Sequence, residues 1–381
     1  MRPSAFAYGT AFAVAFGITL VLTPLCGWIA KRLGAMDDKT DDRRVHVSPT
    51  PYLGGVAMCL GLLGGVAVAW QMDAFDDVFG NGDLRTPLNG ILVAAVIACI
   101  VGTWDDIREV SPPAKTAGLV LSGSALYWMG AALLIVRIPF AGTVVLSWDL
   151  APLLTVIWVM GMANATNFID GLDGLAAGIV AIASGALFLY SYRLSDVSQG
   201  LESVLPVDSP APLIAIVVLG ACVGFLPYNF NPARIFMGDG GALMLGVVMA
   251  GTTMLVGGQT ENQFSGSAFF FYFPLLIPLV VMGAPILDTL WAIIRRTRKG
   301  LSPAHADKNH LHHRLMRMGH GHRRSVLILW TWTGLLSAFV LIPVYTDRGN
   351  AVVPIGLAAA GLVLYTYLHP GARRTREGEA V

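Results

Sequence analysis

Long apolar runs divide this sequence, and each of them is close to the roughly 20 residues that a helix needs to cross a bilayer. Charged residues make up 13% of the chain, about half of the ~25% found in soluble proteins. The runs cover residues 7–30, 53–70, 87–104, 116–136, 150–167, 174–192, 211–229, 240–257, 268–291, 326–344 and 352–369. We therefore predict an all-α integral membrane protein with about eleven transmembrane helices. The whole chain, 1–381, forms one polytopic domain with a short basic tail at 370–381.

The basic residues collect on one side of this predicted bundle. Of the 25 lysines and arginines, 20 fall in the tail and in loops at about 31–52, 105–115, 229–241 and 292–325, and the loop at about 164–174 lies on the same side. The positive-inside rule then places these loops in the cytoplasm. An odd number of helices puts the two termini on opposite sides of the membrane. The basic tail places the C-terminus in the cytoplasm, and so the N-terminus lies outside the plasma membrane of a bacterial-type cell.

Composition excludes several classes of protein. A formal net charge of +1 argues against a nucleic-acid partner. The first apolar run is too long for the core of a cleavable signal peptide and ends in Lys31 and Arg32. The glycines of the second run, such as Gly54 and Gly55, are interpreted as sites of close helix packing.

Adjacent carboxylates close the third apolar run. Asp105 and Asp106 follow Trp104, and Lys115 lies a few residues beyond them. Two negative charges at a helix C-terminus interact unfavourably with the helix dipole. The pair could simply form a turn; alternatively a cation, whether Lys115, a metal ion or a substrate group, lies beside it.

Four polar residues recur at every third position where the fifth run ends. They are Asn164, Asn167, Asp170 and Asp173. On a helix this spacing keeps neighbours on one face, and such side chains are expensive in a membrane unless they have partners or a wet cavity. Hydrogen bonding between helices is one explanation, and a ligand or cation site is the other.

A third polar segment precedes the eighth run and holds Asn229, Arg234 and Asp239. Asp239 stands directly before two glycines and a new helix, so it could cap that helix. It could instead hold a hard cation, because Mg²⁺ is commonly bound by one or two carboxylates together with substrate phosphates.

Histidines are concentrated in the last large loop on the same side. The loop contains six of the eight histidines: His305, His310, His312, His313, His320 and His322. Within this loop, a dense group suits the binding of anionic groups: Asp307, His310, His312, His313 and Arg314. A zinc site is the rival, although no cysteine is available to complete it.

The loop that begins at Asp38 is also basic, and contains Arg43, Arg44 and His46. Attraction to anionic lipid headgroups is enough to account for such charges.

Taken in order, these segments resemble the polyprenyl-phosphate N-acetylhexosamine-1-phosphate transferases. The resemblance runs from about Asp38 to Arg314 and rests on five motifs: D-K-x-x-x-R-R-x-H-x-x-P-x-P-x-x-G-G, W-D-D with S-x-x-x-K, N-x-x-N-x-x-D-G-L-D-G-L, F-M-G-D-x-G, and H-L-H-H-R-L. The predicted helix number and topology are similar to the branch that transfers N-acetylglucosamine 1-phosphate. His310-Leu311-His312-His313 stands where the phospho-N-acetylmuramoyl-pentapeptide enzymes have three consecutive histidines.

The resemblance implies a reaction between a UDP-N-acetylhexosamine, expected to be UDP-GlcNAc, and a membrane polyprenyl phosphate. Asp239 and Asn167 would hold Mg²⁺, with Mn²⁺ as a substitute, and Asp105, Asp106 and Lys115 would be catalytic. The implied nucleotide-sugar residues are Asn164, Asp170, Asp173, Asn229, His310, His312, His313 and Arg314. Those implied for the lipid phosphate or headgroup are Asp38, Arg43, Arg44 and His46. The resemblance also implies a homodimer.

Two departures from the family pattern bear on the sugar. Gly240 and Ala242 stand where the family has hydroxyl-bearing residues. Another UDP-N-acetylhexosamine or the phospho-N-acetylmuramoyl-pentapeptide donor therefore stays open. An anionic-solute transporter is the alternative of a different class, but all 24 acidic residues fall in or at the edges of loops, whereas transport predicts ionisable groups near mid-membrane.

Overall fold

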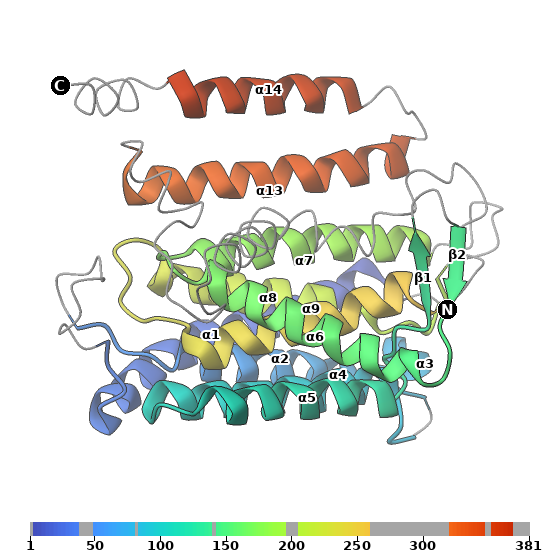
Figure 1. The fold of residues 1–381 in the computed structure, drawn as a ribbon, viewed down its shortest axis with the longest axis horizontal. Coiled ribbons are helices and arrows are strands. Elements are labelled where there is room, and N and C mark those ends of the chain that lie inside the picture. The colour runs from blue at the N-terminus through green and yellow to red at the C-terminus, as the bar shows by residue number, and fades with distance from the viewer. Residues whose placement is uncertain are drawn as a thin grey trace, which may run out of the picture.

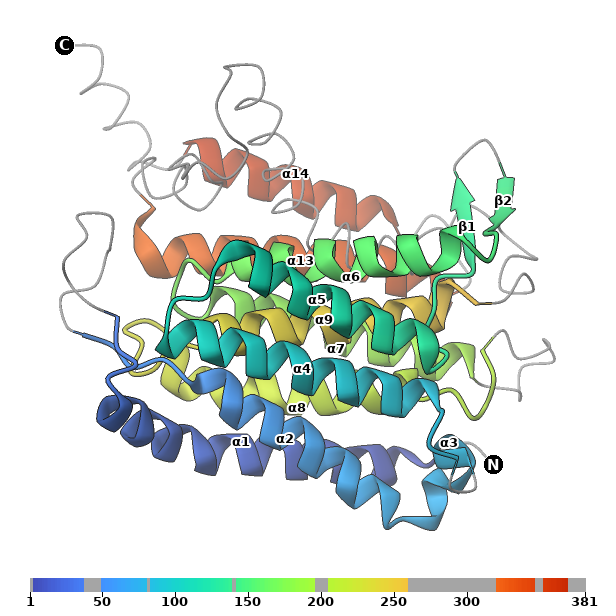
Figure 2. The ribbon, with the colours of Figure 1, turned by 60° about the horizontal axis from the view of Figure 1, so that its bottom comes forward.

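The computed structural model describes residues 3–37, 49–80, 83–138, 142–195, 205–259, 320–346 and 352–368, and their helices lie side by side in a bundle (Figure 1). The helices are α1 (Ala5–Leu33), α2 (Gly54–Trp70), the 3₁₀ turn η1 (Asp73–Phe75), α3 (Asp76–Phe79), α4 (Pro87–Ile107), α5 (Pro112–Trp128), α6 (Leu150–Ile169), α7 (Leu175–Leu194), α8 (Ala211–Asn229), α9 (Gly238–Gly257), α13 (Gly321–Thr346) and α14 (Val352–Leu368). The helices also lie side by side when the bundle is seen from a second direction (Figure 2).

Ten of the eleven predicted runs overlap with described helices. Seven of the described helices are long and apolar enough to cross a membrane. Helix α2 and the segment Asp73–Phe79 after it, which are bent by 97° relative to each other, together form a further candidate. The chain is thus a multi-pass membrane protein. The run at 268–291 lies outside the described residues, so the number of crossings stays a prediction.

The predicted span at 116–136 is wrong in its second half. Helix α5 ends at Trp128, and the backbone turns at Gly130 with a positive φ of 92°. Strands β1 (Ile135–Ile138) and β2 (Gly142–Val145) then pair antiparallel, with Ile135 opposite Val145. Isoleucine and valine are as apolar as helix-forming residues but favour strands, so hydropathy alone extended the helix.

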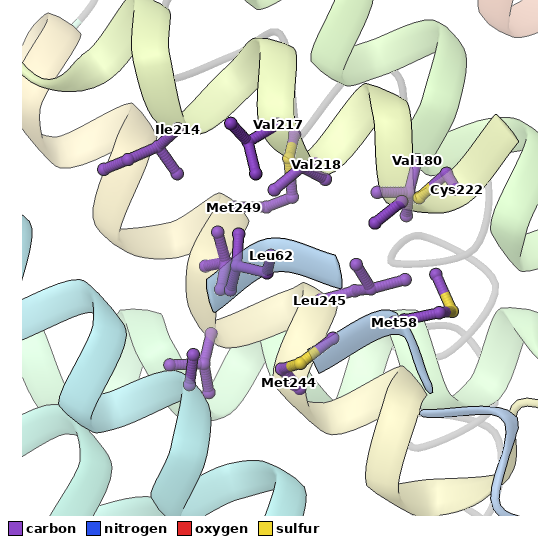
Figure 3. Close-up of a cluster of buried hydrophobic side chains, with 14 of the residues drawn as sticks. Met58, Leu62, Val180, Ile214, Val217, Val218, Cys222, Met244, Leu245 and Met249 are labelled. Carbon is purple, nitrogen blue, oxygen red and sulfur yellow. The ribbon is translucent and has the colours of Figure 1, made fainter. Parts of the chain in front are cut away.

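Helix α9 lies at the centre of the bundle. It packs against α2, α4, α6 and α8, and every residue in its membrane-length window is buried. Figure 3 shows Met244, Leu245 and Met249 of α9 among side chains of α2, α7 and α8. An apolar helix that is buried on all sides anchors the bundle, and its first turn begins at the end where α4 finishes and α5 starts.

Exposed tryptophans mark the ends of several helices. Trp28, Trp70, Trp104, Trp128 and Trp148 each expose half or more of their surface. Indole rings favour the boundary between lipid and water, so this pattern fits helix ends that lie at the two membrane surfaces.

Candidate active site

The first turn of α9 is capped by a side chain from another helix. The backbone N–H groups of Asp239 and Gly240 donate to the two carboxylate oxygens of Asp106, over 2.8 and 3.1 Å. The first N–H groups of a helix have no partner within it, so Asp106, at the end of α4, supplies one. The N-cap residue of α9, Met237, makes no side-chain cap hydrogen bond, and the carboxylate of Asp239 faces Lys115 and Asn167 instead.

Close packing of α4 on α9 makes this cap possible. A Cβ atom at Gly102 would overlap the carbonyl carbon and oxygen of Asp239, and one at Gly240 would press on Thr103. Gly238, which begins α9, has a positive φ of 69°, a conformation that glycine adopts at no steric cost. A larger side chain at position 240 would meet the hydroxyl group of Thr103 on α4. At this contact the hydroxyl group is therefore supplied by α4, not by residue 240 of α9.

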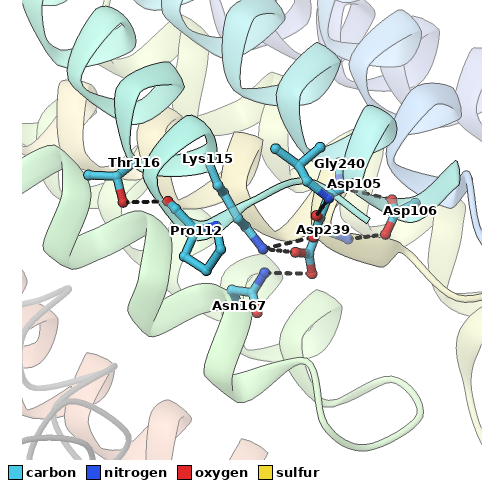
Figure 4. A network of polar contacts seen from close by, with 9 residues as sticks. Asp105, Asp106, Pro112, Lys115, Thr116, Asn167, Asp239 and Gly240 are labelled. Atoms are coloured by element: carbon cyan, nitrogen blue, oxygen red, sulfur yellow. Dashed lines mark hydrogen bonds and ion pairs between the residues drawn. The ribbon is translucent and has the colours of Figure 1, made fainter. Parts of the chain in front are cut away.

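The carboxylate of Asp239 joins side chains from three other helices (Figure 4). The ammonium of Lys115, on α5, donates to Asp239 and also to Oδ2 of Asp105, over 3.1 Å. Asn167, near the end of α6, donates its amide N–H to Oδ1 of Asp239 over 2.7 Å. Residues far apart in the sequence, such as Lys115 and Asp239 at a separation of 124 positions, therefore form one polar cluster at one end of the bundle.

The short link between α4 and α5 places the cation beside the acid pair. The backbone N–H of Val110 donates to Oδ1 of Asp105 over 2.8 Å, which folds the link back onto the end of α4. Pro112 starts α5, and a proline at this position is favourable because its missing N–H has no helical partner there. Lys115, in the first turn of α5, then reaches the carboxylates, so a cation lies where the helix dipole argument predicts one.

Asp173 serves a different purpose from Asp239. Its side chain is fully buried, and its Oδ2 accepts hydrogen bonds from the amide of Asn231, at 2.9 Å, and the backbone N–H of Ala233, at 3.0 Å. Asn229 also ties the two segments, because its Oδ1 accepts from Gly174 and its amide donates to the carbonyl of Ile235. These contacts fix the turn between α6 and α7 against the 229–235 segment.

The remaining predicted residues are less connected or lie elsewhere. Asn164 donates to the carbonyl of Met160 on its own helix, over 2.7 Å. Eight predicted residues fall outside the described residues: Asp38, Arg43, Arg44, His46, His310, His312, His313 and Arg314. Within the described ranges, no three His, Cys, Asp or Glu side chains gather as a ready-made metal site.

Two residues of this region, His322 and Arg323, are not among the predicted site residues. His322 accepts the backbone N–H of Asp173 at Nε2 over 2.9 Å, and Arg323 donates from Nε to the carbonyl of Asn231 over 3.0 Å. His322 and Arg323 directly precede an apolar run on the basic side of the molecule. In the structure both residues lie in the first turn of α13, and no local sequence pattern separates His322 from the other histidines of the loop.

Asp170 follows the last residue of α6 and is only partly exposed. Burial, and next the nearby carboxylates of Asp239, Asp106 and Asp173, raise the pKa of Asp170 well above its ordinary value. Because the folded state holds this proton more tightly than the unfolded state does, the ionisation of Asp170 lowers stability as the pH rises from the usual carboxyl range through the raised pKa.

We expect Asp170→Asn to stabilise the metal-free protein at neutral and alkaline pH, because the amide keeps the shape without the charge. The advantage over the unmodified protein should shrink as the pH falls toward ~4, where an unperturbed carboxyl is half protonated. Thermal unfolding in EDTA across this range measures the difference. A variant with lower stability at every pH would contradict the prediction.

The fold is that of a multi-pass helical membrane protein, and several of its helices each give one polar group to a cluster of two carboxylates, a lysine and an amide. The chain belongs to glycosyl transferase family 4, which matches residues 88–257. It is also 38% identical, over 92% of its length and 86% of the relative's, to decaprenyl-phosphate N-acetylglucosaminephosphotransferase of Mycolicibacterium smegmatis.

Two further relatives show the breadth of the family. The chain is 35% identical to the probable undecaprenyl-phosphate N-acetylglucosaminyl 1-phosphate transferase of Bacillus subtilis, over 84% of this chain and 80% of that one. It is 30% identical to the phospho-N-acetylmuramoyl-pentapeptide-transferase of Mycobacterium bovis, over 92% of this chain and 98% of that one. Identity is thus higher to these two transferases named for N-acetylglucosamine than to the muramoyl-pentapeptide enzyme.

Proposed function

We propose that this protein transfers N-acetylglucosamine 1-phosphate from UDP-GlcNAc to a membrane polyprenyl phosphate. The cluster of Asp105, Lys115, Asn167 and Asp239 at one end of the bundle carries the proposal. An oxygen of the lipid phosphate attacks the sugar-bearing phosphorus of UDP-GlcNAc. The bond from that phosphorus to the bridging oxygen breaks, UMP leaves with this oxygen, and a lipid-linked diphosphate sugar forms.

The cluster supplies what phosphoryl transfer needs, which is positioning and charge neutralisation. The hard oxygen donor of Asp239 suits Mg²⁺, which binds one or two carboxylates together with substrate phosphates; the ion would neutralise the diphosphate. Asn167 orients Asp239 through their 2.7 Å hydrogen bond. Lys115 is placed to meet phosphate oxygens, and Asp105 holds Lys115 in place at 3.1 Å.

A cavity between α2 and α4 would accommodate the polyprenyl chain. It has a volume of about 570 Å³ and is lined mainly by apolar side chains, including Leu60, Leu63 and Ile100. Thr103 and Arg108 line it as well; Arg108 follows the last residue of α4, and Thr103 packs on Gly240. An apolar trough with a cation at one end matches an isoprenoid chain with a phosphate head.

Filling this cavity should weaken the binding of the lipid alone. We expect Leu60→Trp or Ile100→Trp to raise the KM for polyprenyl phosphate about tenfold, since each lost apolar CH₂ contact costs ~0.8 kcal/mol. The KM for UDP-GlcNAc should not change. Leu121→Trp, at an exposed position on α5 outside the cavity lining, is the matched control, and equal effects of all three variants would refute the placement.

The proposal places the active site in the cytoplasm. The ends of α4 and α6 and the starts of α5 and α9 all meet at the cluster, and 20 of the 25 basic residues belong to loops and a tail assigned to that face. This charge bias supports a cytoplasmic face with the N-terminus outside. Assembly as a homodimer is part of the proposal and follows from the family resemblance.

Transfer of radiolabel from UDP-GlcNAc into butanol-soluble lipid tests the function directly. Membranes containing the protein should label polyprenyl phosphate in the presence of Mg²⁺, and tunicamycin should abolish the transfer. UDP-GalNAc and the phospho-N-acetylmuramoyl-pentapeptide donor test the other sugars. Absence of transfer from every donor would refute the enzyme and favour transport of an anionic solute.

A further inference from the structure

His322 contacts the turn between α6 and α7 from a distant part of the sequence. Its Nε2 lies 2.9 Å from the backbone nitrogen of Asp173 and 4.0 Å from Oδ1 of the same residue. Because a backbone N–H can only donate, Nε2 acts as the acceptor and the ring proton sits on Nδ1. The imidazole is 12% exposed, so water competes little for this hydrogen bond.

The helix that carries His322 is held firmly where it meets the turn. The indole of Trp330 fills the space that a Cβ atom of Gly178 would occupy, and its centroid lies 5.7 Å from that of Phe230. Arg323 donates to both the carbonyl and the side-chain oxygen of Asn231, at 3.0 and 3.3 Å. Asn231 in turn donates to Asp173, so α13 grips both segments that meet at this carboxylate.

The turn connects His322 to the polar cluster in few steps. Asp173 is three residues from Asp170, and Asp170 is three residues from Asn167, which donates to Asp239. Asn167 belongs to the last turn of α6, whereas Asp170 is the first residue after it. The backbone N–H of Asp170 donates to the carbonyls of Thr166 and Asn167 on α6, over 3.2 and 3.1 Å, and the chain then continues into the turn that His322 holds at Asp173.

We infer that His322 is a positioning residue for the transfer reaction: it anchors the backbone of Asp173 and so sets the place of Asp170 beside the Asp239 cluster. The inference rests on the proposed function, because the consequence for catalysis follows from the nucleotide-sugar role proposed for Asp170. His322 itself touches neither the cluster nor the reacting atoms. Removing the imidazole leaves the N–H of Asp173 without its acceptor and loosens the turn.

Steady-state kinetics with the two substrates varied separately tests this role in the full-length protein. We expect His322→Ala to raise the KM for UDP-GlcNAc about tenfold, because the variant lacks the acceptor that holds the buried N–H of Asp173. The KM for polyprenyl phosphate should stay unchanged. His322→Gln should restore most of the loss, because its carbonyl oxygen can accept the same N–H.

His320 provides a matched control two residues earlier. Its Nε2 lies 2.9 Å from the carbonyl of Thr366 on α14, far along the chain from the turn. His320→Ala should lower the melting temperature without changing either KM. Equal KM changes in the two alanine variants would show a general effect of weakening α13 and would overturn the inference.

Hydrogen exchange gives a readout that does not depend on activity. Amides of residues 170–178 should exchange faster in His322→Ala than in the unmodified protein or in His322→Gln. If exchange is faster in His322→Ala but the unmodified protein has no transferase activity, the proposed function is refuted and the anchor is retained. If the unmodified protein is active but exchange in His322→Ala is unchanged, the anchor alone is refuted. If the alanine variant does not fold, His322→Leu replaces it. If neither variant folds while His322→Gln does, the positioning role is overturned in favour of a purely structural one.

Discussion

Asp239→Asn should lower the transfer rate by about 10²–10³-fold, the loss typical when one preorganised electrostatic group is removed from an active site. The amide keeps nearly the same volume but carries no charge for Mg²⁺ or for the ammonium of Lys115, which donates to this carboxylate. The remaining activity should lose its dependence on Mg²⁺ concentration. Radiolabel transfer from UDP-GlcNAc, titrated with Mg²⁺ at saturating lipid, measures both effects.

Asp105→Asn is the matched comparison for this prediction. A phosphate monoester has a second pKa near ~6 and is mostly dianionic at pH 7, so the lipid nucleophile needs no strong base. The single amide oxygen at position 105 can still accept from Lys115 or from Val110, which now donate to different oxygens of the carboxylate, so the variant loses one of these two hydrogen bonds. Normal turnover of Asp105→Asn would exclude a base role, whereas a larger loss for Asp105→Asn than for Asp239→Asn would contradict our assignment.

Gly102→Ala should destabilise the protein by about 1–3 kcal/mol, the usual cost of overpacking a tight contact. The added methyl group would overlap the backbone of Asp239, so α4 and α9 must separate. Separation would also lengthen the hydrogen bonds from Asp239 and Gly240 to Asp106, now 2.8 and 3.1 Å. We expect both a lower melting temperature and a loss of transfer activity in purified protein.

The same substitution at Gly161 should have the opposite sign. Gly161 lies within α6, and nothing lies within 4 Å of the position that its Cβ would take. Replacing a helix-interior glycine by alanine is favourable by roughly 0.5–1 kcal/mol. Similar melting temperatures for Gly102→Ala and Gly161→Ala would show that the approach of α4 to α9 is looser than the structure has it.

The polar residues of the cluster are accessible from the sequence because they are rare in their surroundings. Asp105, Asn167 and Asp239 interrupt or end apolar runs, and an unfavourable placement in a membrane indicates function. Their division of labour was harder to predict. The sequence allows Asp239 to cap its own helix, but the cap is supplied by Asp106, which lies 133 positions away. A partner at that distance in the sequence leaves no local pattern.

His322 illustrates what sequence reasoning overlooked. A histidine among six in one basic loop carries no local sign that it alone accepts the N–H of Asp173, a residue 149 positions earlier. The hairpin at β1 and β2 was missed for a related reason, because hydropathy measures transfer to an apolar phase and does not distinguish strands from helices. Pairing of Ile135 with Val145 depends on the turn between them.

The sequence by itself determined the membrane class, the position of ten described helices and the family, because apolar length, charge bias and local motifs are properties of contiguous residues. Only the tertiary structure decided which partners the polar groups have. Helices such as α9 are apolar on every face, so their composition does not specify which neighbour each face meets. That choice depends on close backbone contacts such as Gly102 against Asp239, and these contacts place Asp106, Lys115 and Asn167 around one carboxylate.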